Sequence, residues 1–160
     1  MAVRTLKIFL ILLVFCLAAG TVSACFGPKL FLGVPEDANG RVLTSIVSIY
    51  IKEKTGVETE RVDLAGKDLI AEISAERLDY GFAERSEPDI NVVMEVTGLP
   101  YLVSGPRILD NIQFTTVAPA LTKLQRLLTP DIVQNMRRKV EAGEPPMVVA
   151  RRFMMQQRWI

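Results

Sequence analysis

The spacing of apolar and polar positions after residue 28 predicts strands that alternate with helices. Short apolar stretches, bounded by proline, glycine or charged residues, occur at 29–34, 57–64, 79–83 and 90–96. Stretches of this length and composition are typical of buried strands. Because helical patterns separate the first three of them, the order strand–helix–strand–helix–strand favours a parallel sheet with right-handed crossovers.

The first helical pattern covers residues 41–55, whose apolar side chains recur every three or four positions. Asp37 and Asn39 both stand where a helix N-terminus is capped, and Gly56 stands where a left-handed C-terminal cap is expected. The predicted buried stripe consists of Leu43, Ile46, Val47 and Tyr50, widened by Val42 and Ile49. Ser48 falls outside this stripe and is therefore predicted on the outer face.

A second helix is expected to open at residues 66–68, and its apolar face consists of Leu69, Ile70, Ile73 and Leu78. Three more helices are expected at about 118–128, 129–142 and 146–159. The middle one begins with Thr129 as N-cap and Pro130 at its first position, a strong start signal. Residues 98–101 and 104–106 contain glycine and proline and are interpreted as loops. The predicted fold is one α/β domain, a three-layer lobe with a mostly parallel sheet of four or five strands and helices on both faces.

The N-terminal residues carry the pattern of an export signal. Arg4 and Lys7 precede an unbroken apolar run at 8–19, and small residues follow. The run is too short to span a bilayer comfortably, since about 20 apolar residues are needed. Residues 1–24 are therefore predicted to be a signal peptide and residues 25–160 the mature domain.

The end of this signal contains a candidate modification site. Residues 22–25, Val-Ser-Ala-Cys, resemble the bacterial lipobox, in which the cysteine thiol is acylated and becomes the new N-terminus. Lipidation of Cys25 is the favoured interpretation, and it implies a protein of the periplasm or cell envelope that is held at a membrane by its lipid. Ordinary cleavage after Ala24, which leaves Cys25 as a plain thiol, is the alternative.

Composition excludes several classes of function. The chain contains no histidine, which removes serine–histidine and cysteine–histidine catalysis and the commonest ligand for transition metals. No carboxylates are paired at an interpretable spacing, and no metal-ligand spacing occurs, so an enzyme is not expected and no cofactor is predicted. Without Arg4 and Lys7, two of the 19 basic residues, the mature chain has 17 against 18 acidic ones, a net charge of −1. This balance gives no electrostatic reason to expect a nucleic acid as partner.

Two stretches of the mature chain carry a family resemblance. Residues 33–64, GVPEDANGRVLTSIVSIYIKEKTGVETERVDL, and residues 78–83, LDYGFA, resemble the opening of bacterial periplasmic solute receptors of the glycine betaine and osmoprotectant transport family. Residues 127–160, which contain a Thr-Pro-led helix, a glycine link and a Pro-led helix, resemble that family's ending. The resemblance implies an α/β lobe and a role beside an ABC importer.

The chain departs from this family in length. Such receptors normally have two lobes that close on a ligand, and the second lobe is inserted in the middle of the first. Here only residues 84–89 stand at the point of insertion, and the 136 residues left after removing the first 24 of 160 have room for one lobe. Family members that bind quaternary amines use aromatic cages. One such aromatic often follows the third strand, where this chain has Glu84-Arg85-Ser86.

Most of the candidate ligand-binding residues follow the first and third predicted strands, because open α/β sheets bind ligands beyond the carboxyl ends of their strands. Tyr101, which follows the fourth predicted strand, is added as an aromatic ring that could line a pocket. The candidates are Asn39, Gly40, Arg41, Glu84, Arg85, Ser86 and Tyr101. For the first three, the alternative is a solvated helix cap. For Arg85 it is a surface ion pair with Glu84 or Glu87, and for Tyr101 it is a place in the core. The basic clusters at 137–139 and 151–152 are predicted to be solvated helix faces.

The expected function is that of a lipid-anchored, solute-binding-like protein associated with an osmoprotectant-type ABC importer. Its expected partners are a small solute, either a quaternary amine or amino-acid-like, and the importer permease. A second copy of the chain could supply the missing wall of the site. The alternative is an accessory or interaction lipoprotein that kept the lobe as a scaffold and lost solute binding.

Overall fold

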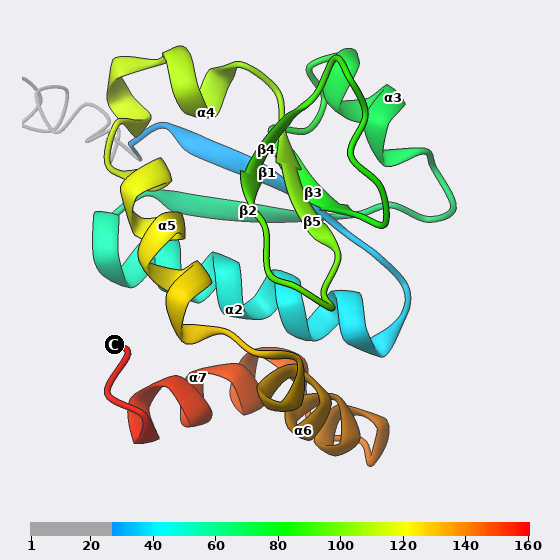
Figure 1. Cartoon of the computed structure of the whole chain (residues 1–160), viewed down its shortest axis with the longest axis vertical. Coiled ribbons are helices and arrows are strands. Elements are labelled where there is room, and N and C mark those ends of the chain that lie inside the picture. The colour runs from blue at the N-terminus through cyan, green and yellow to red at the C-terminus, as the bar shows by residue number, and fades with distance from the viewer. Residues whose placement is uncertain (1–26) are drawn as a thin grey trace, which may run out of the picture.

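The computed structural model describes residues 27–160 and consists of a five-stranded sheet with helices on its two faces (Figure 1). The strands are β1 (Lys29–Val34), β2 (Glu58–Asp63), β3 (Tyr80–Ala83), β4 (Asn91–Met94) and β5 (Tyr101–Ser104). The helices are α2 (Ala38–Thr55), α3 (Leu69–Ser74), α4 (Arg107–Asp110), the 3₁₀ turn η1 (Ile112–Phe114), α5 (Val117–Leu127), α6 (Pro130–Glu141) and α7 (Pro146–Gln156). The predicted signal peptide and Cys25 lie outside the described residues. Within residues 27–160, no helix has the length and apolar character to cross a membrane.

The sheet is mixed, with strand order β2-β1-β3-β5-β4. β1 pairs in parallel with both β2 and β3, which confirms the predicted parallel unit. β5 runs antiparallel to β3 and β4 and lies between them. The prediction that Tyr101 and Ser104 belong to loops is therefore wrong. Glycine and proline on both sides of this segment mark its ends, and the four residues between them form a short strand.

Local sequence signals correctly predicted the caps at Asp37, Gly56 and Thr129. Asp37 caps α2, because its Oδ1 accepts a hydrogen bond from the Gly40 amide at 2.8 Å, and Gly56 ends the helix at φ 75°. α2 begins at Ala38, three residues before the predicted start, so Asn39 lies inside the helix and is not its cap. Thr129 caps α6, as predicted, by accepting a hydrogen bond from the Ile132 amide at 3.4 Å.

α2 is buried on nearly all sides between the sheet and the C-terminal helices. Its residues from Val42 to Ile51 are all buried, and Figure 1 shows α6 and α7 below α2, on the side away from the sheet. Ser48 is only 7% exposed, so its predicted place on an outer face is wrong. The fold therefore has one helical layer more than the three that the sequence predicts. This layer, formed by α6 and α7, covers the side of α2 that would otherwise face solvent.

The opposite face of the sheet packs against α3. Leu69 on this helix fits against Gly33 of β1 and Gly81 of β3, where an added Cβ would lie 2.9 and 2.5 Å from the Leu69 Cδ1. Two glycines on neighbouring strands therefore allow α3 to approach the sheet closely. Leu78, predicted on the helix face, lies after the end of α3 but is buried in the same cluster.

Candidate functional site

The predicted ligand-binding residues lie at one edge of the sheet, called here the carboxyl edge, where β1, β2 and β3 end at Val34, Asp63 and Ala83. The first three candidates occupy the first turn of α2, directly after β1, and the next three follow β3. Tyr101 joins them because it pairs with Ala83 across β3 and β5. After β1 the chain forms β2, which lies on one side of β1 in the sheet. It then forms β3, which lies on the other side of β1. This change of direction is the topological switch point at which open α/β sheets bind ligands.

At the start of α2, the helix cap uses the backbone amides that were candidates for binding a solute. The Gly40 amide donates to Asp37 Oδ1 at 2.8 Å, and the Arg41 amide donates to the Asp37 carbonyl at 3.0 Å. Gly40 is also buried, and an added Cβ at this position would lie 2.6 Å from the Pro35 side chain. These two amides therefore belong to the helix cap, which is the alternative given for them in the sequence analysis. What this turn presents to solvent is the exposed side chain of Arg41 and the half-buried side chain of Asn39.

The residues after β3 present charged side chains to solvent. Glu84, Arg85 and Ser86 are all exposed. Within residues 27–160 Arg85 forms no salt bridge, so the expected pairing with Glu84 or Glu87 is wrong. Such a pair in full solvent gains little, and side-chain entropy outweighs it. The Arg85 guanidinium is therefore open to other anions.

Tyr101 is half-buried and packs against the cluster that contains Leu69 and Val103. The Tyr101 side chain therefore belongs largely to the core, which is the alternative given for it in the sequence analysis. The residue nevertheless borders the carboxyl edge, because its strand begins there, beside the end of β3.

A cation that the sequence analysis did not single out lies near this edge. Arg61 on β2 is half-buried, and its Nε is buried without a hydrogen-bond partner among the described residues. Burial lowers the pKa of Arg61, Asp63 opposes this effect, and the nearby charge of Arg41 lowers the pKa further. Two guanidinium groups are thus close enough to repel each other at the start of α2. Strand periodicity alone gave no signal for this pair, because Arg41 and Arg61 come together only through the β1–β2 pairing.

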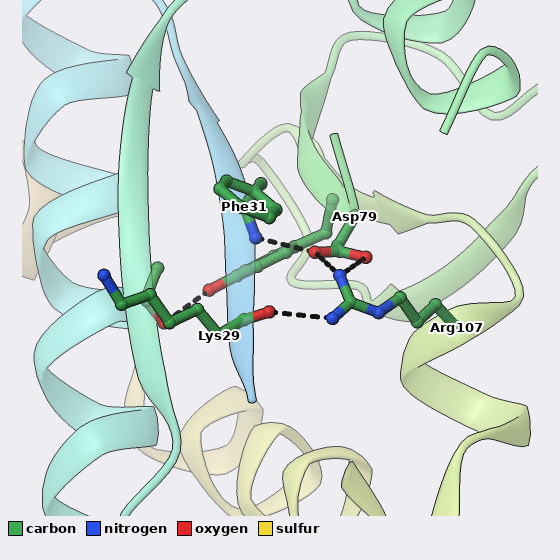
Figure 2. A network of polar contacts seen from close by, with 6 residues as sticks. Lys29, Phe31, Asp79 and Arg107 are labelled. Carbon is green, nitrogen blue, oxygen red and sulfur yellow. Dashed lines mark hydrogen bonds and ion pairs between the residues drawn. The ribbon is translucent and has the colours of Figure 1, made fainter. Parts of the chain in front are cut away.

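A network of polar contacts lies at the opposite edge of the sheet, called here the amino edge, where β1, β2 and β3 begin (Figure 2). Arg107 Nη1 donates to both carboxylate oxygens of Asp79 at 3.1 and 3.0 Å, and Nη2 donates to the Lys29 carbonyl at 3.1 Å. The same carboxylate accepts a hydrogen bond from the Phe31 amide at 2.7 Å. The Arg107 guanidinium also lies 5.1 Å from the centre of the Phe114 ring.

Two members of this network, Asp79 and Arg107, line an open hollow of about 740 Å³ between α3 and α4. Glu76 and Asp110 add carboxylates to its wall, and Ile73 and Leu78 add apolar surface. Because both oxygens of Asp79 are already hydrogen-bonded, we assign the network a structural role, joining β1, β3 and α4. A signal for it existed in the sequence, since an acid at the start of a buried strand requires a partner. The residues described contain no group of three metal-ligating side chains.

The remaining basic clusters behave as predicted, as solvated helix faces held in ion pairs. Arg137 pairs with Glu141 at 3.3 Å, Arg151 with Glu53 at 2.9 Å, and Arg152 with Glu144 at 2.9 Å. These arginines therefore contribute to helix packing rather than to a separate binding site.

Comparisons with known proteins returned no match to this chain, whether with protein-family models, with curated proteins or with solved structures.

Proposed function

We propose that this chain is a solute-binding-like protein of the cell envelope, which binds a small carboxylate-bearing solute at the carboxyl edge of its sheet. The observation that carries this proposal is the switch point between β1 and β3, which gathers Arg41, Arg85 and Tyr101 along one edge. The resemblance to osmoprotectant receptors supports the same edge, because the quoted motifs include both β1 with α2 and β3.

The charges at this edge suit an anionic group. The side chain of Arg41 is exposed, Arg61 is half-buried and its pKa is lowered in part by the charge of Arg41, and Arg85 forms no salt bridge among residues 27–160. Guanidinium groups bind carboxylates through two parallel hydrogen bonds. A betaine or an amino acid has such a carboxylate, and choline does not. We therefore expect the carboxylate rather than the ammonium group to be the recognised part of the solute.

One lobe offers only one wall of a binding site. Polar contacts on an open surface compete with water, so little net affinity remains. We expect the monomer to bind glycine betaine no more tightly than about millimolar, which corresponds to about 4 kcal/mol. A second copy of the chain, or the importer permease, would then supply the other wall.

The second candidate function is that of an accessory lipoprotein which uses the lobe as a scaffold. The observation that favours it is a shallow, mostly apolar hollow of about 360 Å³ along α7, lined by Met147, Val148 and Met155 together with Arg151 and Arg152. Val148 and Met155 are large apolar side chains that are exposed to solvent. In this case the contact with a partner protein would be made by α7, and the carboxyl edge would bind no solute.

Calorimetric titration of the mature chain, residues 25–160 with Cys25→Ser, distinguishes the two candidates. Under the first proposal glycine betaine and amino acids bind near the millimolar range, and choline binds at least tenfold more weakly. Arg85→Gln should weaken betaine binding severalfold, whereas Lys139→Gln, which removes an exposed cation of α6, should not. Equal binding of choline and betaine would contradict the carboxylate argument. Absence of all binding, at protein concentrations that permit dimers and with the permease added, would favour the accessory function.

A further inference from the structure

A second open hollow, of about 690 Å³, lies between the end of α2, the α5 helix and the C-terminal residues after α7. Figure 1 shows that the C-terminus lies on the side of the molecule where α2 ends and α5 begins, far from the switch point. The residues of this hollow that matter here are Tyr50, Lys54, Thr116, Lys123, Arg158 and Trp159. We name it the basic hollow.

Three cations from three different elements surround the basic hollow. Lys54 comes from the last turn of α2, Lys123 from α5, and Arg158 from the residues after α7. Among the described residues, 27–160, no aspartate or glutamate lines the hollow. Within residues 27–160 none of the three cations forms a salt bridge. Like charges around one concavity repel each other, and a bound anion would remove this repulsion.

The neighbouring cations behave differently. Lys52, two residues before Lys54, pairs with Glu58 at 2.6 Å, and Arg151 on α7 pairs with Glu53 at 2.9 Å. The acids of this region are therefore occupied by cations outside the basic hollow. As a result, the charge inside the hollow remains uncompensated.

The backbone after α7 holds Arg158 and Trp159 in the wall of the hollow. Arg158 has φ 58°, a left-handed conformation that residues other than glycine and asparagine seldom adopt. It is fixed by two hydrogen bonds, from the Arg158 amide to the Met155 carbonyl at 3.1 Å and from the Trp159 amide to the Met154 carbonyl at 2.8 Å. The Trp159 ring also packs edge-on against Phe153, with 5.3 Å between the ring centres.

The rest of the wall offers both polar and apolar contacts. Thr116 precedes α5, and its side chain does not cap that helix, so its hydroxyl group is free to meet a ligand. The Tyr50 ring lies below Lys54, with 5.8 Å between the lysine Nζ and the ring centre. Trp159 is half-buried and Leu127 is exposed, which leaves apolar surface next to the cations.

We propose that the basic hollow is a binding site for a phosphate monoester whose remaining part is apolar or aromatic. Lys54, Lys123 and Arg158 contact the phosphate group, which carries nearly two negative charges near neutral pH. Trp159 and Leu127 contact the apolar part. This site is separate from the proposed carboxylate site, because it lies at the end of α2 rather than at its start.

The chain contains its own probe for this site. Trp159 is the only tryptophan in the sequence, so the intrinsic tryptophan fluorescence reports on the wall of the basic hollow. Titration with phenyl phosphate should give a saturable change in this fluorescence, and benzyl alcohol should give none. Raising the salt concentration from 0.05 to about 0.5 M should weaken binding severalfold, since partly exposed charges are screened. A change that does not saturate, or that benzyl alcohol reproduces, would overturn the proposal.

Two variants test the cations directly, and a third serves as the matched control. Lys123→Gln should weaken phenyl phosphate binding about tenfold, the effect of losing one charge-assisted hydrogen bond. Arg158→Gly removes the guanidinium at a position whose positive φ suits glycine, so it should weaken binding about tenfold without lowering the melting temperature. Arg126→Gln removes an exposed cation of the same helix as Lys123, outside the hollow, and should leave binding unchanged. Equal losses in Arg126→Gln and Lys123→Gln would overturn the proposal.

The phosphate monoester could belong to a soluble compound or to a lipid headgroup, and vesicles separate these sources. Vesicles of phosphatidylcholine with phosphatidic acid present a phosphate monoester, whereas pure phosphatidylcholine vesicles do not. Binding of the first kind alone, competed by phenyl phosphate and weakened by Lys123→Gln, would identify a lipid headgroup at this site. Binding of phenyl phosphate without any vesicle binding would identify a soluble ligand. Vesicle binding that depends neither on phenyl phosphate nor on Lys123, with no phenyl phosphate binding, would overturn the proposal.

Discussion

Arg107 binds both carboxylate oxygens of Asp79 through a single nitrogen, at 3.1 and 3.0 Å, and so joins α4 to the residue that precedes β3. The two partners differ in environment, since the Asp79 side chain is 6% exposed and that of Arg107 is 41% exposed. The carboxylate also accepts the Phe31 amide at 2.7 Å. One buried acid therefore connects β1, β3 and α4 at the amino edge.

The first prediction concerns this acid. Asp79→Ala should lower the free energy of unfolding by about 2–3 kcal/mol, because the Phe31 amide loses its acceptor and Arg107 loses its partner. Asp79→Asn should cost only about 1 kcal/mol, since an amide oxygen can still accept from Phe31. Urea denaturation measures both. Asp110→Ala, which removes an exposed acid from the same hollow, is the control, and equal losses for Asp79→Ala and Asp110→Ala would contradict the assigned role.

The second prediction concerns the close approach of α3 to the sheet. A methyl group at Gly81 would lie 2.5 Å from Leu69 Cδ1, so Gly81→Ala should destabilise the protein by about 1–3 kcal/mol through overpacking. Gly105→Ala meets its nearest neighbour, Ile73 Cγ2, at 3.3 Å and should cost less. In the background of Leu69→Ala the cost of Gly81→Ala should largely disappear. An unchanged cost in that double variant would show that the clash lies elsewhere.

Sequence patterns predicted the elements whose signals are local. The Asp37 and Thr129 caps, the glycine at the end of α2 and the three strands of the parallel unit depend on neighbouring residues, and all of them are confirmed. The strand β5 was missed, because a four-residue strand between glycine–proline segments has no periodicity of its own. Its pairing with β3 is decided by tertiary contacts.

The candidate site shows the same division. The common edge of the residues after β1 and β3 followed from the rule that parallel strands end together, and the structure places them there. The amides at Gly40 and Arg41 are hydrogen-bonded to Asp37, which reduces what this turn can offer a solute. The Asp79–Arg107 pair and the basic hollow were not predicted, because their members are far apart in sequence and meet only in the folded chain.

The third prediction concerns the buried helix α2. Ile46→Ala should leave a cavity and lower the free energy of unfolding by about 2–4 kcal/mol. Ser48→Leu should also destabilise, by about 1–3 kcal/mol, because Ser48 is buried and a larger side chain overpacks the space around it. Thermal or urea unfolding measures both variants. A neutral Ser48→Leu, together with a costly Ile46→Ala, would indicate that the outer side of α2 is open to solvent.

The fourth prediction concerns pH. Burial raises the pKa of Tyr80, while its hydrogen bond with the Thr59 hydroxyl, at 2.9 Å, opposes this effect. Well below pH 10 the tyrosine is neutral in both the folded and the unfolded chain, so it contributes no pH dependence there. Above that pH the unfolded chain releases the proton and the folded chain retains it. The free energy of unfolding should therefore fall with pH, by up to about 1.4 kcal/mol per pH unit from this residue.

Comparison of the wild type with Tyr80→Phe isolates this effect. The variant should be less stable at pH 8, because Thr59 loses a hydrogen-bond partner, but its stability should fall less steeply above pH 10. Part of the fall should remain, since burial also raises the pKa of Tyr50. Parallel curves of unfolding free energy against pH for the two proteins would show that Tyr80 ionises freely.

The fifth prediction concerns the anchor expected at Cys25. Cys25→Ser should abolish acylation and move the protein from the membrane fraction to the soluble envelope fraction. An unmodified Cys25 in the intact mass of the wild type would contradict the lipoprotein interpretation. If the anchor is present, geometry limits where it acts, because only three residues separate Cys25 from Lys29 at the start of β1, so that Lys29 is the fourth residue after the anchor. Four extended residues span at most about 14 Å.

A lipid at Cys25 would therefore hold the amino edge near the bilayer, including η1, where Ile112 is 84% exposed. The carboxyl edge lies the length of β1 away, about 20 Å. On vesicles carrying the acylated protein, Ile112→Cys should react with a soluble maleimide severalfold more slowly than in the free protein, and Arg85→Cys should react at an unchanged rate. This arrangement leaves the proposed solute site facing away from the lipid surface that the anchor occupies. Equal protection at both positions would mean that the carboxyl edge also contacts the membrane, and the proposed solute site would then be covered.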